Sequence, residues 1–116
     1  MMVEVPAAAL TAAAFDADFY SIGSNDLIQY TMAASRDCSG VANLYDASNA
    51  AVLELIARVA AHGAASGRDV SLCGEMASDP AAIAPLLDAG LTALSVTPLA
   101  LAQVKFAIAE HGRKAE

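Results

Sequence analysis

The chain has 116 residues, of which 57% are hydrophobic and 16% are charged, and this composition suits one globular domain and excludes a disordered chain. A net charge of −7, with 6 Lys and Arg residues, argues against binding to nucleic acid or to anionic membranes. No apolar run approaches the roughly 20 residues that a spanning helix needs, and the start of the chain has no basic signal region. We therefore expect one cytoplasmic domain over residues 1–116, with Cys38 and Cys73 as free thiols.

Hydrophobic periodicity predicts strands that alternate with helices along the chain. The first half predicts a strand at 2–5, an Ala-rich helix at 7–15 after Pro6, a strand at 19–22, a helix at 25–34 and a polar loop at 35–40. The second half predicts a helix through Val52, Leu55, Ile56 and Val59 with Gly63 and Gly67 as stops, a strand at 70–73, a helix from Pro80 to Gly90 and a strand at 94–96. A last helix should begin at Pro98 and bury Leu101, Val104 and Ile108, and the polar tail from His111 should fray.

Four strand–helix units of this kind indicate a parallel sheet in an α/β fold. An eight-unit barrel needs about 250 residues, so the chain is either a small open sheet or part of a barrel. In both architectures, ligands bind at the carboxyl ends of the strands. Polar side chains gather near those ends, namely Glu4, Asn25, Asp26, Cys73 and Glu75.

Glu4 and Asp26 are candidate metal ligands because they follow two successive strands. Neighbouring parallel strands lie about 4.8 Å apart, and two carboxylates that close repel each other unless a cation lies between them. Mg²⁺ suits such a pair, since it binds one or two carboxylates and leaves its other positions to substrate oxygens. The alternative is that Asp26 only complements the dipole of the helix that begins beside it.

Arg36 and Cys73 are two further candidates near these strand ends. The preceding helix carries Arg36 about 15 Å away, so a loop must fold back before its guanidinium can bind phosphate or carboxylate. Otherwise Arg36 is a solvated surface residue. Cys73 ends the third strand beside Glu75, and nearby negative charge disfavours a thiolate. We expect a protonated thiol that can donate a proton, or else a small buried apolar side chain.

Three motifs resemble the C-terminal part of the phosphoenolpyruvate-utilising enzymes. They are MVEVPAAA at residues 2–9, FYSIGSNDLIQYT at residues 19–31 and CGEMA at residues 73–77. They occur in the family's order, and the resemblance covers almost the whole chain. Within the family, the CGEMA run favours similarity to the phosphoenolpyruvate–protein phosphotransferases, the enzyme I group of the sugar phosphotransferase system.

The resemblance implies a (β/α)8 TIM barrel that binds phosphoenolpyruvate and Mg²⁺, with this chain supplying about the last four units as a half-barrel. Matched by motif, Glu4 and Asp26 resemble metal ligands, and Cys73 resembles the acid that protonates the enolate. Asn25, Asp26 and Arg36 resemble residues that contact phosphoenolpyruvate. The implied reaction transfers a phosphoryl group to a protein histidine and releases pyruvate.

The resemblance also implies partners and a missing upstream half. That half would supply further arginines, the phosphohistidine and the route to a phosphocarrier protein, so we expect the chain to be inactive alone. Its open sheet edges predict self-association, in the simplest case as a homodimer.

Two other functions remain open at this point. Pyruvate phosphate dikinase or phosphoenolpyruvate synthase is the alternative enzyme within the family. A binding or dimerisation module that kept the fold without the chemistry is the alternative from another class. The presence of all the site groups, including Cys73, favours the enzyme.

Overall fold

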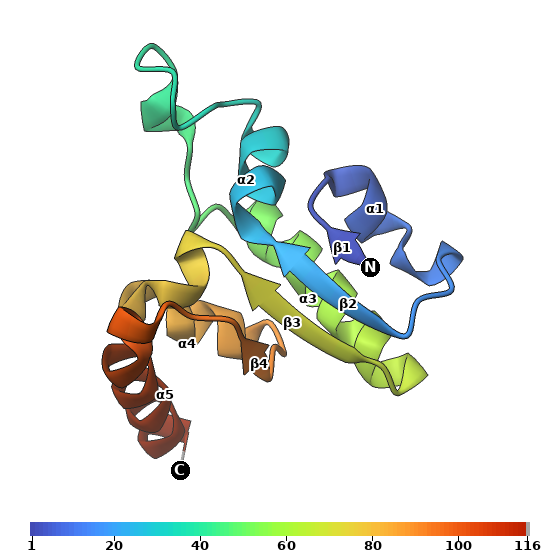
Figure 1. Cartoon of the computed structure of the whole chain (residues 1–116), viewed down its shortest axis with the longest axis vertical. Coiled ribbons are helices and arrows are strands. Elements are labelled where there is room, and N and C mark those ends of the chain that lie inside the picture. Colours follow the sequence, from blue (N-terminus) through green and yellow to red (C-terminus); the bar gives the residue numbers. More distant parts are fainter. Residues whose placement is uncertain (116) are drawn as a thin grey trace.

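A computed structural model describes residues 1–115, and it contains a four-stranded parallel sheet with helices packed against it (Figure 1). The strands are β1 (Met2–Val3), β2 (Phe19–Gly23), β3 (Asp69–Cys73) and β4 (Ala93–Leu94). They lie in the order β1-β2-β3-β4, and each neighbouring pair is parallel. The predicted α/β arrangement with a parallel sheet is therefore confirmed.

Five α-helices follow or separate the strands: α1 (Pro6–Leu10), α2 (Ser24–Met32), α3 (Ala50–Ser66), α4 (Pro80–Asp88) and α5 (Leu101–Ala115). Short 3-10 turns occur at η1 (Ala12–Ala14), η2 (Ala42–Leu44), η3 (Glu75–Ser78) and η4 (Pro98–Ala100). The helix starts match the sequence signals, since Pro6 and Pro80 are first residues and Asp79 Oδ1 accepts a bond from the Ala81 N–H at 3.0 Å.

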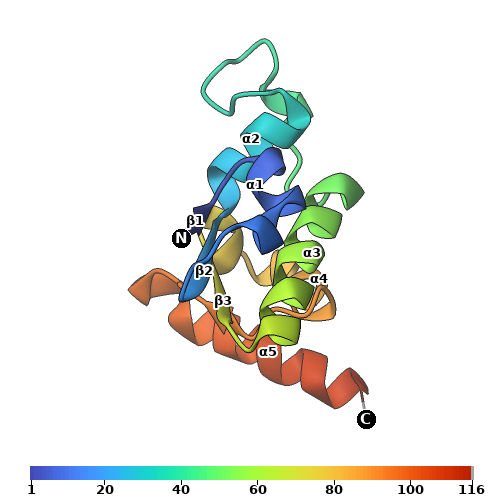
Figure 2. The ribbon, with the colours of Figure 1, turned by 90° about the vertical axis from the view of Figure 1, so that its right-hand side faces the viewer.

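The sheet has two different faces because side chains alternate along each strand. Tyr20, Ile22 and Leu72 are fully buried beneath α1 and α3, which Figure 2 shows on one side of the strands. Gly23 and Cys73 are paired in register and belong to the opposite face, where they are partly exposed. Cys73 therefore lies on a face of the sheet that α1 and α3 do not cover.

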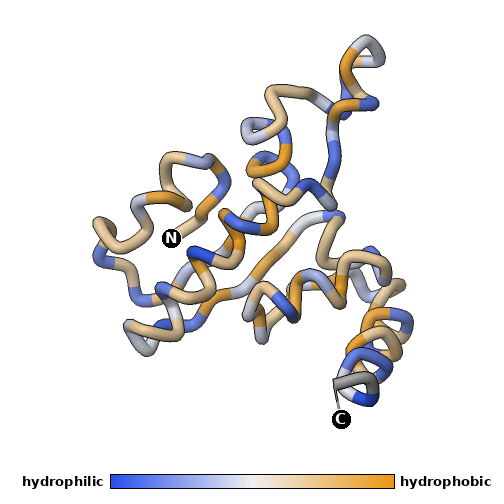
Figure 3. Tube along the Cα trace, turned by 180° about the vertical axis from the view of Figure 1, so that it is seen from behind, coloured by the Kyte–Doolittle hydropathy of each residue, from blue (hydrophilic) through white to orange (hydrophobic). Residues whose placement is uncertain are grey.

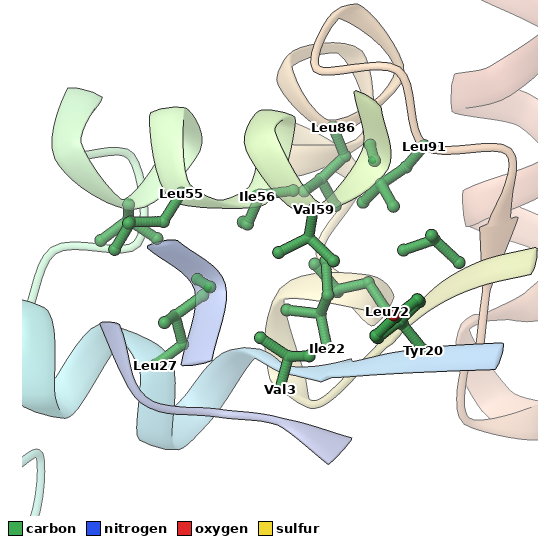
Figure 4. Packing of buried hydrophobic residues seen from close by; sticks show 14 of the residues in the cluster. Val3, Tyr20, Ile22, Leu27, Leu55, Ile56, Val59, Leu72, Leu86 and Leu91 are labelled. Atoms are coloured by element: carbon green, nitrogen blue, oxygen red, sulfur yellow. The ribbon is translucent and has the colours of Figure 1, made fainter. Parts of the chain in front are cut away.

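The core lies between the covered face of the sheet and α3. Ile56 and Val59 of α3 lie on the side of the strands that carries Val3 and Leu72, and Leu55 lies farther along α3 (Figure 4). Each of these five side chains is at most 7% exposed. This packing holds the carboxyl ends of β1, β2 and β3 together, and those ends carry the candidate site.

The Ala-rich helix predicted at 7–15 is wrong in its extent. It stops at Leu10, and the Thr11 hydroxyl donates to the Ala7 carbonyl oxygen at 2.7 Å before a 3-10 turn begins. The buried Tyr20 hydroxyl donates to the Phe15 carbonyl oxygen at 2.9 Å and lies 3.3 Å from that of Ala12. The phenol therefore ties the 3-10 turn and the residue after it to β2, and local sequence does not predict such a contact.

Three smaller expectations also differ from the structure. The helix α3 runs through Gly63 and ends at Ser66 with Gly67 as its cap, so His62 is an internal residue whose Nε2 lies 3.2 Å from the Tyr20 hydroxyl. The last strand is at Ala93–Leu94, with the Ser95 N–H still bonded to β3 at 2.8 Å. The chain from His111 to Ala115 is helical and continues α5, where the sequence predicted a frayed tail, and Glu116 lies outside the described residues.

The outer surface of α5 is partly apolar. Val104 is buried as predicted, but Leu101 and Ile108 are 44% and 40% exposed. The helix extends from the body of the molecule beside α4, and apolar and hydrophilic residues alternate along it (Figure 3). Within residues 1–115, no helix combines the length and the hydropathy needed to cross a membrane.

Candidate functional site

The carboxylate of Glu4 lies over the end of β2. A Cβ atom added to Gly23 would stand 3.0 Å from both the Cβ and the Oε2 atoms of Glu4. The missing side chain at Gly23 therefore makes the room that the Glu4 carboxylate occupies. This places Glu4 on the open face, beside the junction where β2 ends and α2 begins.

The junction itself is fixed by a buried serine. Ser24 is fully buried at the start of α2, and its hydroxyl donates to the Cys73 carbonyl oxygen at 2.8 Å. Asp26 follows in the first turn of α2 and is exposed. Its position suits both predicted roles, since the first turn faces the strand ends and also favours a negative charge.

Asn25 is oriented by the turn that follows β3. Gly74 has a φ of +106°, and a Cβ there would come within 2.3 Å of the Ser24 Oγ and 2.9 Å of the Asn25 Oδ1. The close approach lets the Glu75 N–H donate to Asn25 Oδ1 at 3.1 Å. The carboxamide oxygen of Asn25 accepts this bond, so the NH2 group of Asn25 remains available as a donor. It lies at the carboxyl ends of β1, β2 and β3, which we call the mouth of the sheet.

Cys73 presents its thiol to the open face. The Sγ atom lies 3.5 Å from the Ile22 carbonyl oxygen, a position in which the S–H donates, and the Ser21 hydroxyl lies 3.9 Å from Sγ. The thiol is partly exposed, so it is accessible from the open face of the sheet.

Arg36 does fold back to the mouth. Ala33 ends α2 in the left-handed region with a φ of +50°, and the chain then turns so that Arg36 pairs with Glu75. The carboxylate of Glu75 raises the pKa of Arg36 above its ordinary value, mainly by charge attraction and then by the hydrogen bond. The guanidinium is therefore a permanent cation within reach of the strand ends.

Tyr45 is a site residue that sequence reasoning missed. Its hydroxyl donates to the Asn25 carbonyl oxygen at 3.3 Å. Burial raises the pKa of Tyr45, Arg36 opposes that shift, and the carboxylates of Glu75 and Asp26 add to it. No local pattern marks this tyrosine, since it follows Asn25 by 20 residues and is brought back by a loop.

A hollow of about 450 Å³ lies beside these residues. Asn25 and Glu75 line one part of it, while Ser78 and Thr97 line another. The Thr97 N–H donates to the Ser78 hydroxyl at 3.1 Å, which ties the segment after β4 to the segment after β3. The hollow is therefore built from the carboxyl ends of β2, β3 and β4.

A family model described as the PEP-binding domain of PEP-utilising enzymes matches residues 1–113. The chain belongs to the phosphoenolpyruvate-utilising enzyme family. The match extends over nearly the whole chain, so it includes every residue of the mouth described above.

Known members of this family are similar over most of the chain. A phosphoenolpyruvate-protein phosphotransferase from Bacillus sp. (strain S) is 52% identical over 99 residues, or 84% of this chain. Proteins with the same name from Borreliella burgdorferi and Bacillus subtilis are 43% and 44% identical over 95% and 98% of this chain. The chain spans 17% to 20% of the length of these relatives.

The donor set of this family member fits a small divalent cation. Glu4 and Asp26 have no ion-pair partner among the side chains that the structure describes, although both lie at the strand ends. The described residues contain no cluster of three or more His, Cys, Asp and Glu side chains that could hold a metal alone. Two free carboxylates without further protein ligands are what Mg²⁺ uses when substrate oxygens complete its shell.

Proposed function

We propose that this chain is the phosphoenolpyruvate- and Mg²⁺-binding part of a phosphoenolpyruvate–protein phosphotransferase. The observation that carries the proposal is that Glu4, Asn25, Asp26 and Cys73 end or directly follow neighbouring parallel strands, while Arg36 pairs with Glu75 just after β3. The names of the relatives support the same reaction class.

The chain would supply about the last four units of a (β/α)8 barrel. Three features support this architecture: all four strands are parallel, the helices α1 and α3 cover one face, and Glu4 and Cys73 belong to the other. In a barrel that second face would line the interior, and ligands would bind at the carboxyl end of the strands.

Glu4 and Asp26 would hold Mg²⁺, while Asn25, Asp26 and Arg36 would bind phosphoenolpyruvate. The metal, when bound, supplies positive charge that stabilises phosphate and enolate oxygens. Arg36 adds a planar fork of donors that suits a phosphate. The Asn25 NH2 group adds a neutral donor whose direction is set by the Glu75 N–H.

Cys73 would act as the proton donor that completes pyruvate. When the P–O bond of phosphoenolpyruvate breaks, the phosphoryl group moves to a histidine nitrogen and leaves an enolate. The methylene carbon of the enolate then forms a C–H bond with the thiol proton, and the thiolate is later reprotonated from water. The partial exposure of Cys73 at the end of β3 supports this role, because its thiol is accessible from the open face of the sheet.

The histidine that accepts the phosphoryl group would belong to another part of a longer protein. His62 contacts the buried Tyr20, and His111 lies 3.3 Å from the Asp88 carboxylate, so both are engaged outside the mouth. A phosphocarrier protein would receive the group next, and the process would serve sugar transport in the cytoplasm.

Calorimetric titration with phosphoenolpyruvate, with and without Mg²⁺, tests this proposal. We expect metal-dependent binding that Asp26→Ala abolishes. Asp69→Ala is the matched control, because Asp69 is an exposed carboxylate at the opposite end of the same sheet. An affinity that does not change when Mg²⁺ is omitted, or that is unchanged in Asp26→Ala, would contradict the proposed ligands.

A folded chain that binds nothing would contradict assembly of the site on this chain alone. The same titration on a longer parent protein would then show whether upstream arginines are required for binding.

A further inference from the structure

The loop at residues 33–49 is held to the strand ends by contacts that join distant parts of the chain. Arg36 forms an ion pair with Glu75, and the Tyr45 hydroxyl donates to the Asn25 carbonyl oxygen at 3.3 Å. Most of the loop is otherwise exposed, and it projects beyond the end of α2 (Figure 1). Its position relative to the mouth therefore depends on a small number of side chains.

Arg36 lies just beyond the last well-buried residue of this loop. Ala34 is 2% exposed, whereas the Arg36 side chain is 41% exposed and the residues from Arg36 to Gly40 are all exposed. Packing fixes the chain as far as Ala34 but does not fix the direction of the guanidinium. A long, flexible side chain at such a position needs a specific partner to stay in one place.

Glu75 is suited to be that partner because its backbone is rigid. Gly74, with its positive φ, leads into η3, and the Glu75 N–H is bonded to Asn25 Oδ1. The next two residues, Met76 and Ala77, are 4% and 0% exposed and anchor the turn in the core. The Glu75 carboxylate, by contrast, is 73% exposed, so it is an accessible acceptor on a fixed base.

We propose that Glu75 is a positioning residue, whose carboxylate keeps the Arg36 guanidinium at the mouth until the phosphate of a ligand takes its place. A carboxylate and a phosphate offer a guanidinium the same kind of paired oxygen acceptors. The exposed ion pair is weak enough to be exchanged, and a doubly charged phosphate is the stronger partner. The replacement of the Glu75 carboxylate by phosphate as the partner of Arg36 rests on the proposed function, whereas the holding of the loop by Glu75 does not.

A positioning role and simple competition predict changes of opposite sign in the affinity for phosphate when Glu75 is removed. If Glu75 only competed with the ligand, its removal would free Arg36 and strengthen phosphate binding. If Glu75 positions Arg36, its removal leaves the guanidinium disordered, and binding must bear the entropic cost of ordering it. The two roles therefore predict opposite changes in affinity for the same substitution.

The first test needs no ligand. Amide hydrogen exchange in residues 36–44 should be faster in Glu75→Gln than in the unaltered chain, and Arg36→Gln should speed it by the same factor. The variant that carries both substitutions should exchange no faster than either single variant. Glu54→Gln is the matched control, since it removes another exposed ion pair, with Arg58 on α3, and should leave the loop unchanged. Unchanged exchange in Glu75→Gln would overturn the proposal.

A charge exchange separates the holding of the loop from the binding of phosphate. The double variant Arg36→Glu with Glu75→Arg should restore slow exchange in the loop because the ion pair is re-formed with reversed charges. It should still fail to bind phosphoenolpyruvate, because the cation now stands on the wrong side of the mouth. If amide hydrogen exchange in the loop were as fast as in the single variants, the ion pair would not be what holds the loop.

The second test measures affinity for phosphoenolpyruvate in the presence of Mg²⁺. Glu75→Gln should weaken binding roughly three- to tenfold, the range expected when one preorganised contact is lost, and Glu75→Asp should recover part of the loss. Tighter binding in Glu75→Gln would overturn the positioning role. If the unaltered chain binds no phosphoenolpyruvate, the proposed site is not assembled on this chain alone, and the exchange experiment alone decides the role of Glu75 in holding the loop.

Discussion

At residue scale, the site depends on two places where a side chain is missing. Gly23 leaves room for the Glu4 carboxylate, and Gly74 lets the turn after β3 approach Ser24 and Asn25. Both glycines lie at the ends of paired strands, in register with or directly after Cys73. The positions of the candidate ligands Glu4 and Asn25 are thus set by close backbone contacts as well as by their own side chains.

We predict that Gly74→Ala damages the site more than a glycine substitution that is merely strained. The added Cβ would lie 2.3 Å from the buried Ser24 Oγ, so the turn must move. Gly67→Ala is the control, because Gly67 also has a positive φ, +67°, but has open space around it. Thermal or denaturant unfolding should show a loss of about 1–3 kcal/mol from strain in both variants, with a clearly larger loss in Gly74→Ala. Equal losses would show that the contact with Ser24 does not matter.

Cys73 can be tested without phosphoryl transfer, through proton exchange at pyruvate. With Mg²⁺ present in heavy water, the chain should speed deuterium incorporation into the pyruvate methyl group, because the same thiol exchanges a proton with the enolate carbon. Cys73→Ala should slow this exchange by about 100-fold, a common contribution of a general acid or base. Cys38→Ala, which alters the exposed thiol of the loop, should keep the rate. A full rate in Cys73→Ala would assign the proton to another group.

Residue-scale prediction from sequence succeeded where the position of a side chain follows from its strand. Glu4, Asn25, Asp26 and Cys73 end or follow strands, so their gathering at one mouth could be predicted from the alternation of elements. Tyr45 could not be found in this way. It reaches the mouth only because a loop returns to Asn25, and that return depends on contacts between distant residues.

At element scale, α3 is the helix against which the sheet is built. Its buried residues Val52, Leu55, Ile56 and Val59 have the predicted helical spacing. Gly63 extends this face toward β3, since a Cβ at that position would lie 2.2 Å from Val70 Cγ2 and 2.8 Å from the Arg68 carbonyl oxygen. The close approach explains why a glycine lies inside α3 and does not end it.

We predict opposite effects for two glycine-to-alanine substitutions in helices. Gly63→Ala should destabilise the fold by about 1–3 kcal/mol, the usual cost of overpacking a core. Gly112→Ala in α5, where an added Cβ meets nothing within 4 Å, should stabilise the helix by up to about 1 kcal/mol. Denaturant unfolding of the two variants measures both changes. A stable Gly63→Ala variant would mean that α3 and β3 can separate freely.

The sequence predicted the type of the main elements better than their ends. The proline signals at Pro6 and Pro80 marked helix starts correctly because they act within one turn. The turn after α1 was missed because it is tied to Tyr20 of β2, a contact that local sequence does not indicate. The burial of Leu101 and Ile108 was also predicted wrongly, since helical spacing marks an apolar face but does not reveal whether anything covers it.

At the scale of the whole molecule, the sheet has unpaired edges and an open face. The strands β1 and β4 are at the two edges. Met2 and Phe19, which belong to the open face by alternation, are 49% and 55% exposed. The parallel order could be predicted from the repeated strand–helix units, but the sequence could not say which surfaces remain bare.

These surfaces predict that the isolated chain self-associates. Unpaired edges and exposed apolar side chains favour contact with another chain, while the two-residue edge strands should keep the contact concentration-dependent. Light scattering at micromolar concentrations should give masses above 11.8 kDa that rise with concentration. A mass of 11.8 kDa throughout that range would contradict self-association.

The measurement that tests the central claim most directly is the location of a bound divalent cation. Mn²⁺ accepts the same oxygen ligands as Mg²⁺, and its unpaired electrons broaden nearby amide signals in nuclear magnetic resonance spectra. With phosphoenolpyruvate present, we predict that Glu4 and residues 23–26 broaden first, and that Asp26→Ala removes this selectivity. Broadening that is spread over the acidic surface, or that centres on the opposite end of the sheet near Asp69, would contradict a metal and substrate site at this mouth.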